Sequence, residues 1–298
     1  MRCVIIRHMQ KPHKKQKTAV GDRTGSHSHK PGKKVTRAES ADRHRLYELA
    51  VQDVDHEFDF VDTTFRKIRG RRANLLREDF CGTANMSCKW VKSRGKNRAI
   101  GVDIDPEVLD WGRKHNIAKL KPDARERIEL IQADVLDVKT VLADVVTAMN
   151  FSYQLFKTRK QLKDYFSSVR ASLADDGILF MDAYGGYDSY REIKEKRKLK
   201  GFTYIWEQAH YSPISGEMAC YIHFKFPDKS KLHRAFSYNW RLWTLPELRE
   251  LLDEAGFSRV TVHWEGTDEE TGEGDGIYSP ATVGDADPSW VCFITAEK

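Results

Sequence analysis

The chain has 298 residues, of which 40% are hydrophobic and 32% charged, which is enough apolar material for one large domain or two modest ones. Its formal charge of +6 is uneven, because residues 1–40 hold eleven Lys and Arg against two acids, while the remainder is mildly acidic. No apolar run approaches about 18 residues, so we expect no membrane-spanning helix. The five cysteines lack C-x-x-C spacing, so we expect a cytoplasmic protein without a disulfide framework or a bound metal.

The N-terminal region divides into two parts. Residues 1–40 carry almost no periodic apolar positions and are predicted to form a disordered basic arm, which leaves nucleic-acid binding possible. Residues 41–72 are predicted to form a helical cap with helices over 43–52 and 56–69, the second ending at Gly70.

From residue 73 to 298 we predict one α/β domain. Strands at 74–80, 98–104, 127–132, 144–149 and 178–183 alternate with helices at 84–92, 106–116 and 158–174. Alternation at this spacing is typical of βαβ units, so the fold class predicted is α/β with a doubly wound, mostly parallel sheet.

The alternation of strands and helices ends after Gly186. We expect a charged helix over 187–200 and then three aromatic-rich strands within 202–243, which favour an antiparallel insertion. A helix with a capping-box pattern begins at Thr244. Two last strands, at 259–264 and 290–295, are expected to be joined by an acidic, Gly-rich loop over 268–287.

Small and acidic residues mark where a ligand would bind. The first strand leads into Cys81-Gly-Thr-Ala84, a turn that lets a ligand approach the N-terminus of a helix. Asp103 ends the next strand, where a carboxylate can accept hydrogen bonds from ribose hydroxyls, and Asp134 follows the third strand. The turn lacks G-x-G-x-x-G, which argues against a dinucleotide pyrophosphate.

These segments, taken in order from residue 70 to 296, resemble the successive motifs of class I S-adenosylmethionine-dependent methyltransferases. The resemblance implies a seven-stranded sheet with a reversed last strand, and methyl transfer from S-adenosylmethionine with S-adenosylhomocysteine as product. The family's functional positions correspond to a cofactor site formed by Glu78, Phe80, Gly82, Asp103, Ile104, Asp134, Val135, Asn150 and Phe151. Phe80 and Ala84 depart from the family's usual glycines, and this puts the backbone path of the turn in question.

Methyl transfer needs the nucleophile held close to the methyl group and in line with it. We place Asn150 and Tyr153, after the fourth strand, in catalytic positions. The acceptor site is predicted to include Tyr47, Tyr153, Trp206, His210 and Tyr221. The sequence does not identify a general base, although His210, His223 and Glu207 in the inserted strands could serve.

The favoured function is methylation of nitrogen or oxygen in a small molecule bound under the aromatic insertion. Two alternatives stay open. The basic arm and residues 191–200, where six of ten residues are Lys or Arg, would suit an RNA methyltransferase. The Phe80 departure would suit a protein that binds S-adenosylmethionine without catalysis.

Overall fold

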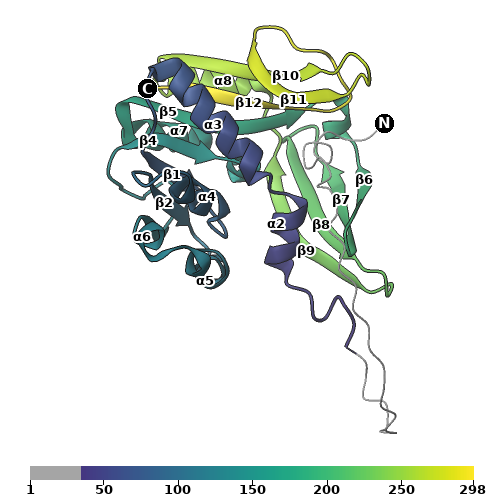
Figure 1. The fold of residues 1–298 in the computed structure, drawn as a ribbon. Coiled ribbons are helices and arrows are strands. Elements are labelled where there is room, and N and C mark those ends of the chain that lie inside the picture. The colour runs from purple at the N-terminus through teal and green to yellow at the C-terminus, as the bar shows by residue number, and fades with distance from the viewer. Residues whose placement is uncertain (1–34) are drawn as a thin grey trace, which may run out of the picture.

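The computed structural model describes residues 35–298, so most of the predicted basic arm lies outside the described residues. The described chain contains two β-sheets (Figure 1). The larger has the strand order β11-β10-β12-β5-β4-β1-β2-β3, and the smaller has the order β6-β7-β8-β9.

Five adjacent parallel strands run to one edge of the larger sheet, with β1 between β2 and β4. These strands are β1 (Leu75–Asp79), β2 (Arg98–Asp103), β3 (Ile128–Gln132), β4 (Ala143–Ala148) and β5 (Leu173–Gly185). The helices between them are α4 (Asn85–Ser93), α5 (Pro106–His115), α6 (Pro122–Arg125) and α7 (Arg159–Ser172), with 3-10 turns η1 (Ile117–Lys119) and η2 (Ser152–Leu155). The predicted βαβ organisation is confirmed. Strand order reverses at β1 and β4, which is where an open α/β sheet binds ligands.

The C-terminal edge of this sheet is antiparallel. Following α8 (Leu245–Glu254), β10 (Arg259–Thr267) pairs with β12 (Trp290–Glu297), which returns antiparallel to β5. The reversed strand is confirmed, but the expected loop over 268–287 is wrong, because it contains an eighth strand, β11 (Gly274–Ala281). Its glycines and Pro280 hid the strand pattern, and an edge strand tolerates proline because one side of its ladder has no partner.

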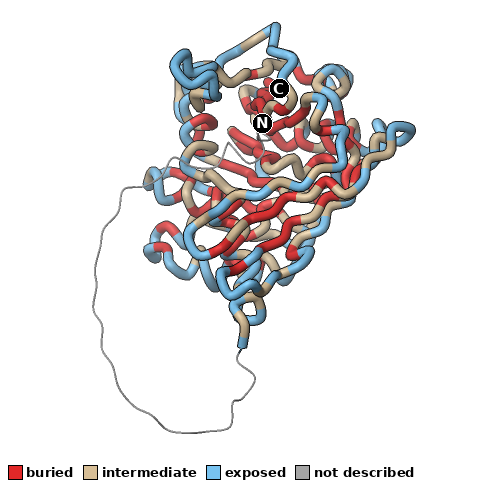
Figure 2. The backbone as a smooth tube through the Cα atoms, turned by 90° about the vertical axis from the view of Figure 1, so that its right-hand side faces the viewer, coloured by how far each residue is buried: buried red, intermediate tan, exposed pale blue. Residues whose placement is uncertain are grey.

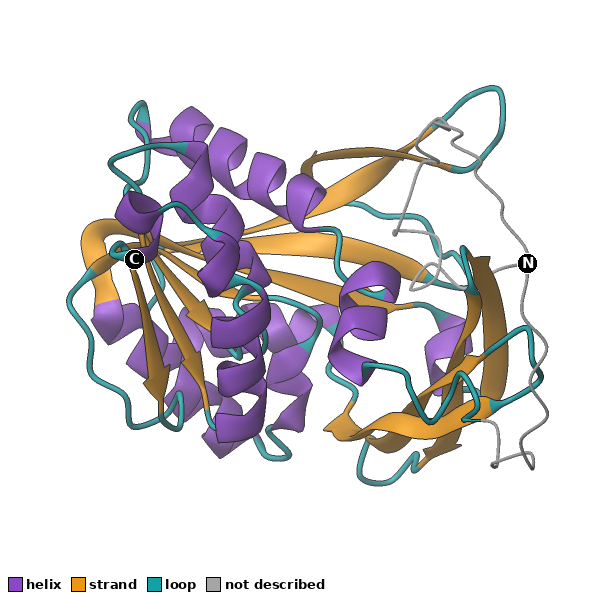
Figure 3. Cartoon of the chain, turned by 60° about the horizontal axis from the view of Figure 1, so that its bottom comes forward, coloured by secondary structure: helices purple, strands orange, loops and turns teal. Residues whose placement is uncertain are grey.

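Helices cover both faces of the larger sheet (Figure 3). Along β5, Leu179 and Met181 pack with α7 and α8, whereas Ile178 and Phe180 pack with α3 and α4. Alternate side chains of a strand point to opposite faces, so this continuous apolar run reads as a strand buried on both sides. The buried segments accordingly run through the middle of the molecule (Figure 2).

The smaller sheet contains β6 (Ile193–Leu199), β7 (Phe202–Tyr211), β8 (Glu217–Lys225) and β9 (Lys231–Arg241), all antiparallel. The inserted strands are confirmed, but the charged helix expected over 187–200 is wrong. A 3-10 turn, η3 (Tyr187–Tyr190), and strand β6 occupy it. Ile193 and Leu199 are half-buried, and Lys194, Lys196 and Lys198 between them are exposed. Burial therefore follows the two-residue period of a strand, despite the helix-like spacing of charges.

Two N-terminal helices join the sheets. Helix α2 (Arg43–Ala50) lies between the α5 side of the larger sheet and strand β9, whereas α3 (Val54–Arg69) packs along the larger sheet (Figure 1). The N–H groups of Arg37 and Ala38 donate to Asp228 and Ser230 beside β9. The described chain is thus attached to the smaller sheet a few residues before the expected boundary at 41.

Candidate active site

The turn after β1 repeats one unusual backbone conformation. Phe80, Gly82 and Ala84 have φ values of 55°, 51° and 56°, all in the left-handed region that favours glycine. Phe80 and Ala84 adopt it despite a steric cost of roughly 1–2 kcal/mol each. The turn therefore follows a glycine-type path at positions where the sequence has no glycine.

Asp103 at the end of β2 stabilises this turn. Its carboxylate accepts hydrogen bonds from the Gly82 N–H at 2.8 Å and the Asp105 N–H at 3.0 Å. Burial raises the pKa of Asp103, although these two hydrogen bonds act in the opposite direction. Next to it, the side chain of Ile104 is 66% exposed, which is unusual for a large apolar residue at the end of a buried strand.

We call the cavity at this edge the outer cleft. It has a volume of about 640 Å³ and opens to solvent. The larger sheet contributes Phe80–Thr83, Asp103–Asp105 and Asn150, while α2 and β9 contribute the opposite wall, including Tyr47, Tyr238 and Trp240. The outer cleft therefore lies at the point where strand order reverses, between the two sheets.

Two successive residues after β4 also have a left-handed backbone conformation. Asn150 and Phe151 have φ values of 58° and 57°. Their N–H groups both donate to the carboxylate of Asp182 on β5, each at 2.9 Å. Because β4 and β5 are parallel neighbours, Asp182 reaches the residues directly after β4.

Behind this turn lies a second, smaller cavity, which we call the inner pocket. Tyr47, Asn150, Tyr238 and Trp240 line both the inner pocket and the outer cleft, so the two cavities share one wall. Phe151, Tyr204 and Trp206 add further aromatic surface.

Three acids also line the inner pocket, namely Asp53, Glu57 and Asp182. Burial raises the pKa of Glu57 to about 8, and the neighbouring Asp182, Glu78 and Asp53 act in the same direction. Burial likewise raises the pKa of Asp182 to about 7. Such shifts concentrate at functional sites, because a buried carboxylate without a cation is costly to ionise.

Helix α2 is attached to the turn after β1 through Glu48. The buried carboxylate of Glu48 accepts hydrogen bonds from the Thr83 hydroxyl at 2.9 Å and the Asn116 amide at 2.6 Å. Arg45 pairs with its other oxygen at 2.8 Å. The same helix supplies Tyr47, so this network positions the wall shared by the two cavities.

Most of the predicted cofactor residues gather at these cavities. Phe80, Gly82, Asp103, Ile104 and Asn150 line the outer cleft, and Phe151 lines the inner pocket. Phe80 also packs in the core, its ring centroid 5.6 Å from that of Tyr165.

Three other predicted cofactor residues line neither cavity. Glu78 points to the start of α4, where it accepts from the N–H of Ser87 at 2.8 Å and from its hydroxyl at 2.6 Å. Burial raises the pKa of Glu78 to about 7. Asp134 is exposed and bonds to the Leu136 N–H, and Val135 is buried in the core.

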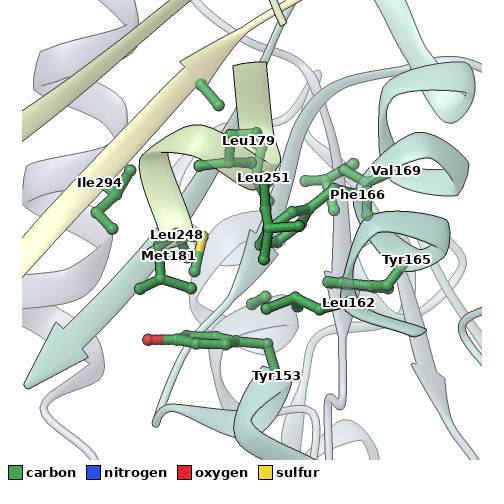
Figure 4. Close-up of a cluster of buried hydrophobic side chains, with 14 of the residues drawn as sticks. Tyr153, Leu162, Tyr165, Phe166, Val169, Leu179, Met181, Leu248, Leu251 and Ile294 are labelled. Carbon is green, nitrogen blue, oxygen red and sulfur yellow. The ribbon is translucent and has the colours of Figure 1, made fainter. Parts of the chain in front are cut away.

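The predicted acceptor residues divide in the same way. Tyr47 and Trp206 line the inner pocket. Tyr153 is fully buried in the core, in the cluster with Leu162, Met181 and Leu248, and lines neither cavity (Figure 4).

His210 and Tyr221 lie away from both cavities. His210 is exposed, 3.6 Å from Glu192. Tyr221 is paired with Glu207 across β7 and β8, on the sheet face opposite to Trp206. His223 bonds to Glu207 at 2.7 Å on that same outer face, so neither of these proposed bases reaches the inner pocket.

Sequence reasoning missed Glu57 and Asp182. Asp182 interrupts the apolar run of β5, and a lone acid in a buried strand is a recognisable signal. Glu57 gave no such signal, because an acid in the first turn of a helix is ordinary. The alternating aromatics of β9 were recognised, and Tyr238 and Trp240 are the ones that line the pocket.

Comparison with known proteins agrees with this geometry. Residues 79–181 match the methyltransferase-domain family, a segment that includes both the turn after β1 and the turn after β4. The chain is also 22% identical over 225 residues to a candidate methyltransferase of Geobacillus sp. (strain WCH70), covering 72% of this chain and 86% of that protein.

Solved structures share the fold at low sequence identity. An S-adenosylmethionine-dependent methyltransferase from Clostridium acetobutylicum ATCC 824 is 16% identical, with a TM-score of 0.60, covering 84% of this chain and 96% of that one. DesVI of Streptomyces venezuelae is 18% identical, with a TM-score of 0.61, covering 86% and 98%. Residues 79–181 therefore form a methyltransferase domain, and the fold is that of class I methyltransferases. The chain is an enzyme with a methyltransferase domain.

Within residues 35–298, no helix is long and apolar enough to cross a membrane. The same residues contain no group of three or more His, Cys, Asp or Glu side chains placed to hold a metal ion.

Proposed function

We propose that this enzyme transfers a methyl group from S-adenosylmethionine in the outer cleft to a nitrogen or oxygen of a small molecule in the inner pocket. The observation that carries this proposal is the wall shared by the two cavities, at Asn150, Tyr47, Tyr238 and Trp240. A donor and an acceptor on either side of one wall meet at close range, and holding two reactants in line supplies several kcal/mol of barrier lowering.

The residues of the outer cleft fit the cofactor. Asp103 faces the cleft and offers a carboxylate to the ribose hydroxyls, while the exposed side chain of Ile104 offers an apolar surface to the adenine. The turn over Phe80–Ala84 leads into the N-terminus of α4. The partial positive charge of this helix end suits the carboxylate in the methionine part of S-adenosylmethionine. S-adenosylmethionine supplies an electrophilic methyl group attached to a sulfonium.

The surroundings of the inner pocket favour a small acceptor over RNA. The exposed lysines of β6 line the outer face of the smaller sheet with Lys231, His233 and Arg234, on the side away from the inner pocket. A polyanion held on that face would be separated from the shared wall by the sheet itself. An enclosed pocket lined by aromatic rings with few polar groups suits a metabolite.

Calorimetric titration of the full chain with S-adenosylhomocysteine, with NADH as the control ligand, tests the proposal. We expect micromolar binding of the first, about 8 kcal/mol, and none of the second. A folded protein that binds neither compound would contradict the assignment of the outer cleft. Turnover on RNA but on no member of an amine and phenol panel would favour the RNA alternative.

A further inference from the structure

The inner pocket is an aromatic enclosure built by three elements. Trp206 from β7 and Tyr238 and Trp240 from β9 form a group, with ring centroids 6.1 Å apart for Trp206 and Tyr238 and 4.4 Å apart for Tyr238 and Trp240. Tyr47 from α2 and Tyr204 from β7 line the same space. The faces of such rings attract cations, by about 0.5–2 kcal/mol per ring.

Among the described residues, acidic side chains line the inner pocket without Lys or Arg beside them. Asp53, Glu57 and Asp182 line it, and none of its described lining residues is Lys or Arg. His56 also lines it and bonds to the carbonyl of Gly276 at 3.1 Å. Ionised carboxylates in this enclosure would therefore lack a cation from the described lining, and a cationic ligand would supply one.

Trp206 adds a separate observation. Its side chain is 97% buried, since only 3% of the residue is exposed, and it lines the inner pocket. Its indole N–H has no hydrogen-bond acceptor among the described residues. A buried donor left without an acceptor costs about 1–3 kcal/mol, so a ligand oxygen within reach of this N–H would be stabilised.

We propose that the methyl acceptor is an amine that also carries an acceptor oxygen, bound as an ammonium ion by Glu57 and Asp182 within the aromatic enclosure. The oxygen accepts from the Trp206 N–H, and Glu57 takes the proton that frees the nitrogen lone pair. This inference rests on the proposed function and names its substrate class.

The chemical step balances with these groups alone. The ammonium nitrogen gives one proton to the Glu57 carboxylate and becomes a neutral amine. Its lone pair forms a bond to the methyl carbon as the carbon–sulfur bond breaks, and that electron pair stays on sulfur. The products are neutral S-adenosylhomocysteine and a methylated ammonium ion.

Glu57 suits the role of proton acceptor because its surroundings oppose ionisation. Asp53 and His56 face it from its own helix, Tyr47 from α2, Glu78 from β1, Asp182 from β5 and Tyr238 from β9. At neutral pH the empty pocket therefore keeps the Glu57 proton. Entry of an ammonium ion favours ionisation, so binding should release about one proton.

The test uses the full chain saturated with S-adenosylhomocysteine and three probes, namely 2-aminocyclohexanol, cyclohexylamine and cyclohexane-1,2-diol. Calorimetry at pH 7 in two buffers of different ionisation enthalpy gives affinity and proton release together. We expect the amino alcohol to bind at least tenfold more tightly than the diol, about 1.4 kcal/mol, and to release about one proton.

Two variants separate the parts of the proposal. Glu57→Gln should weaken the amino alcohol at least tenfold and remove most of the proton release, with S-adenosylhomocysteine affinity unchanged within about twofold. Trp206→Phe keeps an aromatic face and removes the N–H, so it should weaken the amino alcohol more than it weakens cyclohexylamine. Glu250→Gln, an exposed change on α8, is the matched control and should alter neither probe.

Several results would overturn the inference. These are equal binding of the amino alcohol and the diol, full affinity in Glu57→Gln, or no amine binding up to about 10 mM in protein that binds S-adenosylhomocysteine. In each case the proposed function would stand. Loss of S-adenosylhomocysteine binding in the unmodified protein would instead remove the proposed function.

Discussion

The carboxylate of Asp182 bonds to the backbone N–H of Phe151 at 2.9 Å, and this contact connects the turn after β4 to the inner pocket. The same carboxylate binds the N–H of Asn150. Two successive non-glycine residues in the left-handed region cost roughly 1–2 kcal/mol each, and two hydrogen bonds to one carboxylate offset that cost. A single buried acid thus shapes the wall shared by the outer cleft and the inner pocket.

Asp182→Asn should destabilise the protein by about 1–3 kcal/mol at pH 8, where the carboxylate is ionised. The amide has one acceptor oxygen in place of two, so one N–H of the turn loses its partner. Urea unfolding measures the change, with the exposed Asp253→Asn on α8 as the control. Equal effects of the two substitutions would show that the turn does not depend on Asp182.

Stability of the ligand-free protein should fall as the pH rises from about 5 to about 8. Burial raises the pKa values of Glu78 and Asp182 to about 7 and of Glu57 to about 8, whereas the unfolded chain ionises these acids near pH 4. The folded state therefore holds more protons throughout this window, and the loss of stability is complete once the pH exceeds the folded pKa values.

Glu57→Gln should reduce this slope, because the amide remains neutral at every pH. Each regained kcal/mol raises Tm by roughly 2–4 °C in a chain of this size. Thermal scans at several pH values give the comparison, and Glu250→Gln should leave the slope unchanged. A slope that is the same in Glu57→Gln would mean that Glu57 ionises normally.

Phe80→Gly should separate packing from backbone conformation. Removing the ring loses its contacts with Tyr165 and Phe156, about 3–5 kcal/mol for a core aromatic, and glycine recovers roughly 1–2 kcal/mol of backbone strain. We expect a net destabilisation of about 1–4 kcal/mol with S-adenosylhomocysteine affinity within about threefold. A much larger loss of affinity would show that the ring itself contacts the cofactor.

Glu48→Ala should weaken cofactor binding by detaching α2 from the turn after β1. Thr83 and Asn116 lose a buried acceptor, which costs about 1–3 kcal/mol. Arg45→Ala removes the exposed partner of the same carboxylate and should cost less than about 1 kcal/mol. Unfolding and S-adenosylhomocysteine titration of both variants test the difference. Equal losses would assign the effect to the ion pair.

Asp103→Ala should abolish S-adenosylhomocysteine binding while the protein stays folded. It removes the carboxylate offered to the ribose and the acceptor of the Gly82 N–H. Asp103→Asn keeps one acceptor for that N–H and should retain a measurable but weaker affinity. Calorimetry with circular dichroism distinguishes lost binding from lost fold. Normal affinity in Asp103→Ala would contradict the placement of the cofactor.

Much of the fold was predictable because it depends on local periodicity. The alternation of strands and helices from β1 to β5 follows apolar spacing, and the acid ending β2 was placed from its position alone. The predictions of a helix over 187–200 and a loop over 268–287 were wrong for a related reason. Their strands lie at sheet edges, where burial is weak and charges or glycines obscure the two-residue period.

The sequence by itself indicated the methyltransferase fold and most of the residues of the larger sheet that line the outer cleft, since those residues sit in consecutive turns at strand ends. Only the tertiary structure decided the lining of the inner pocket. Tyr47, Glu57, Asp182 and Trp206 come from a helical cap, a parallel strand and an inserted sheet far apart in the chain. Only one face of the inserted sheet turns toward the inner pocket. Trp206 lies on that face, whereas Tyr221 lies on the opposite one. Such selection depends on packing between sheets, which no local pattern encodes.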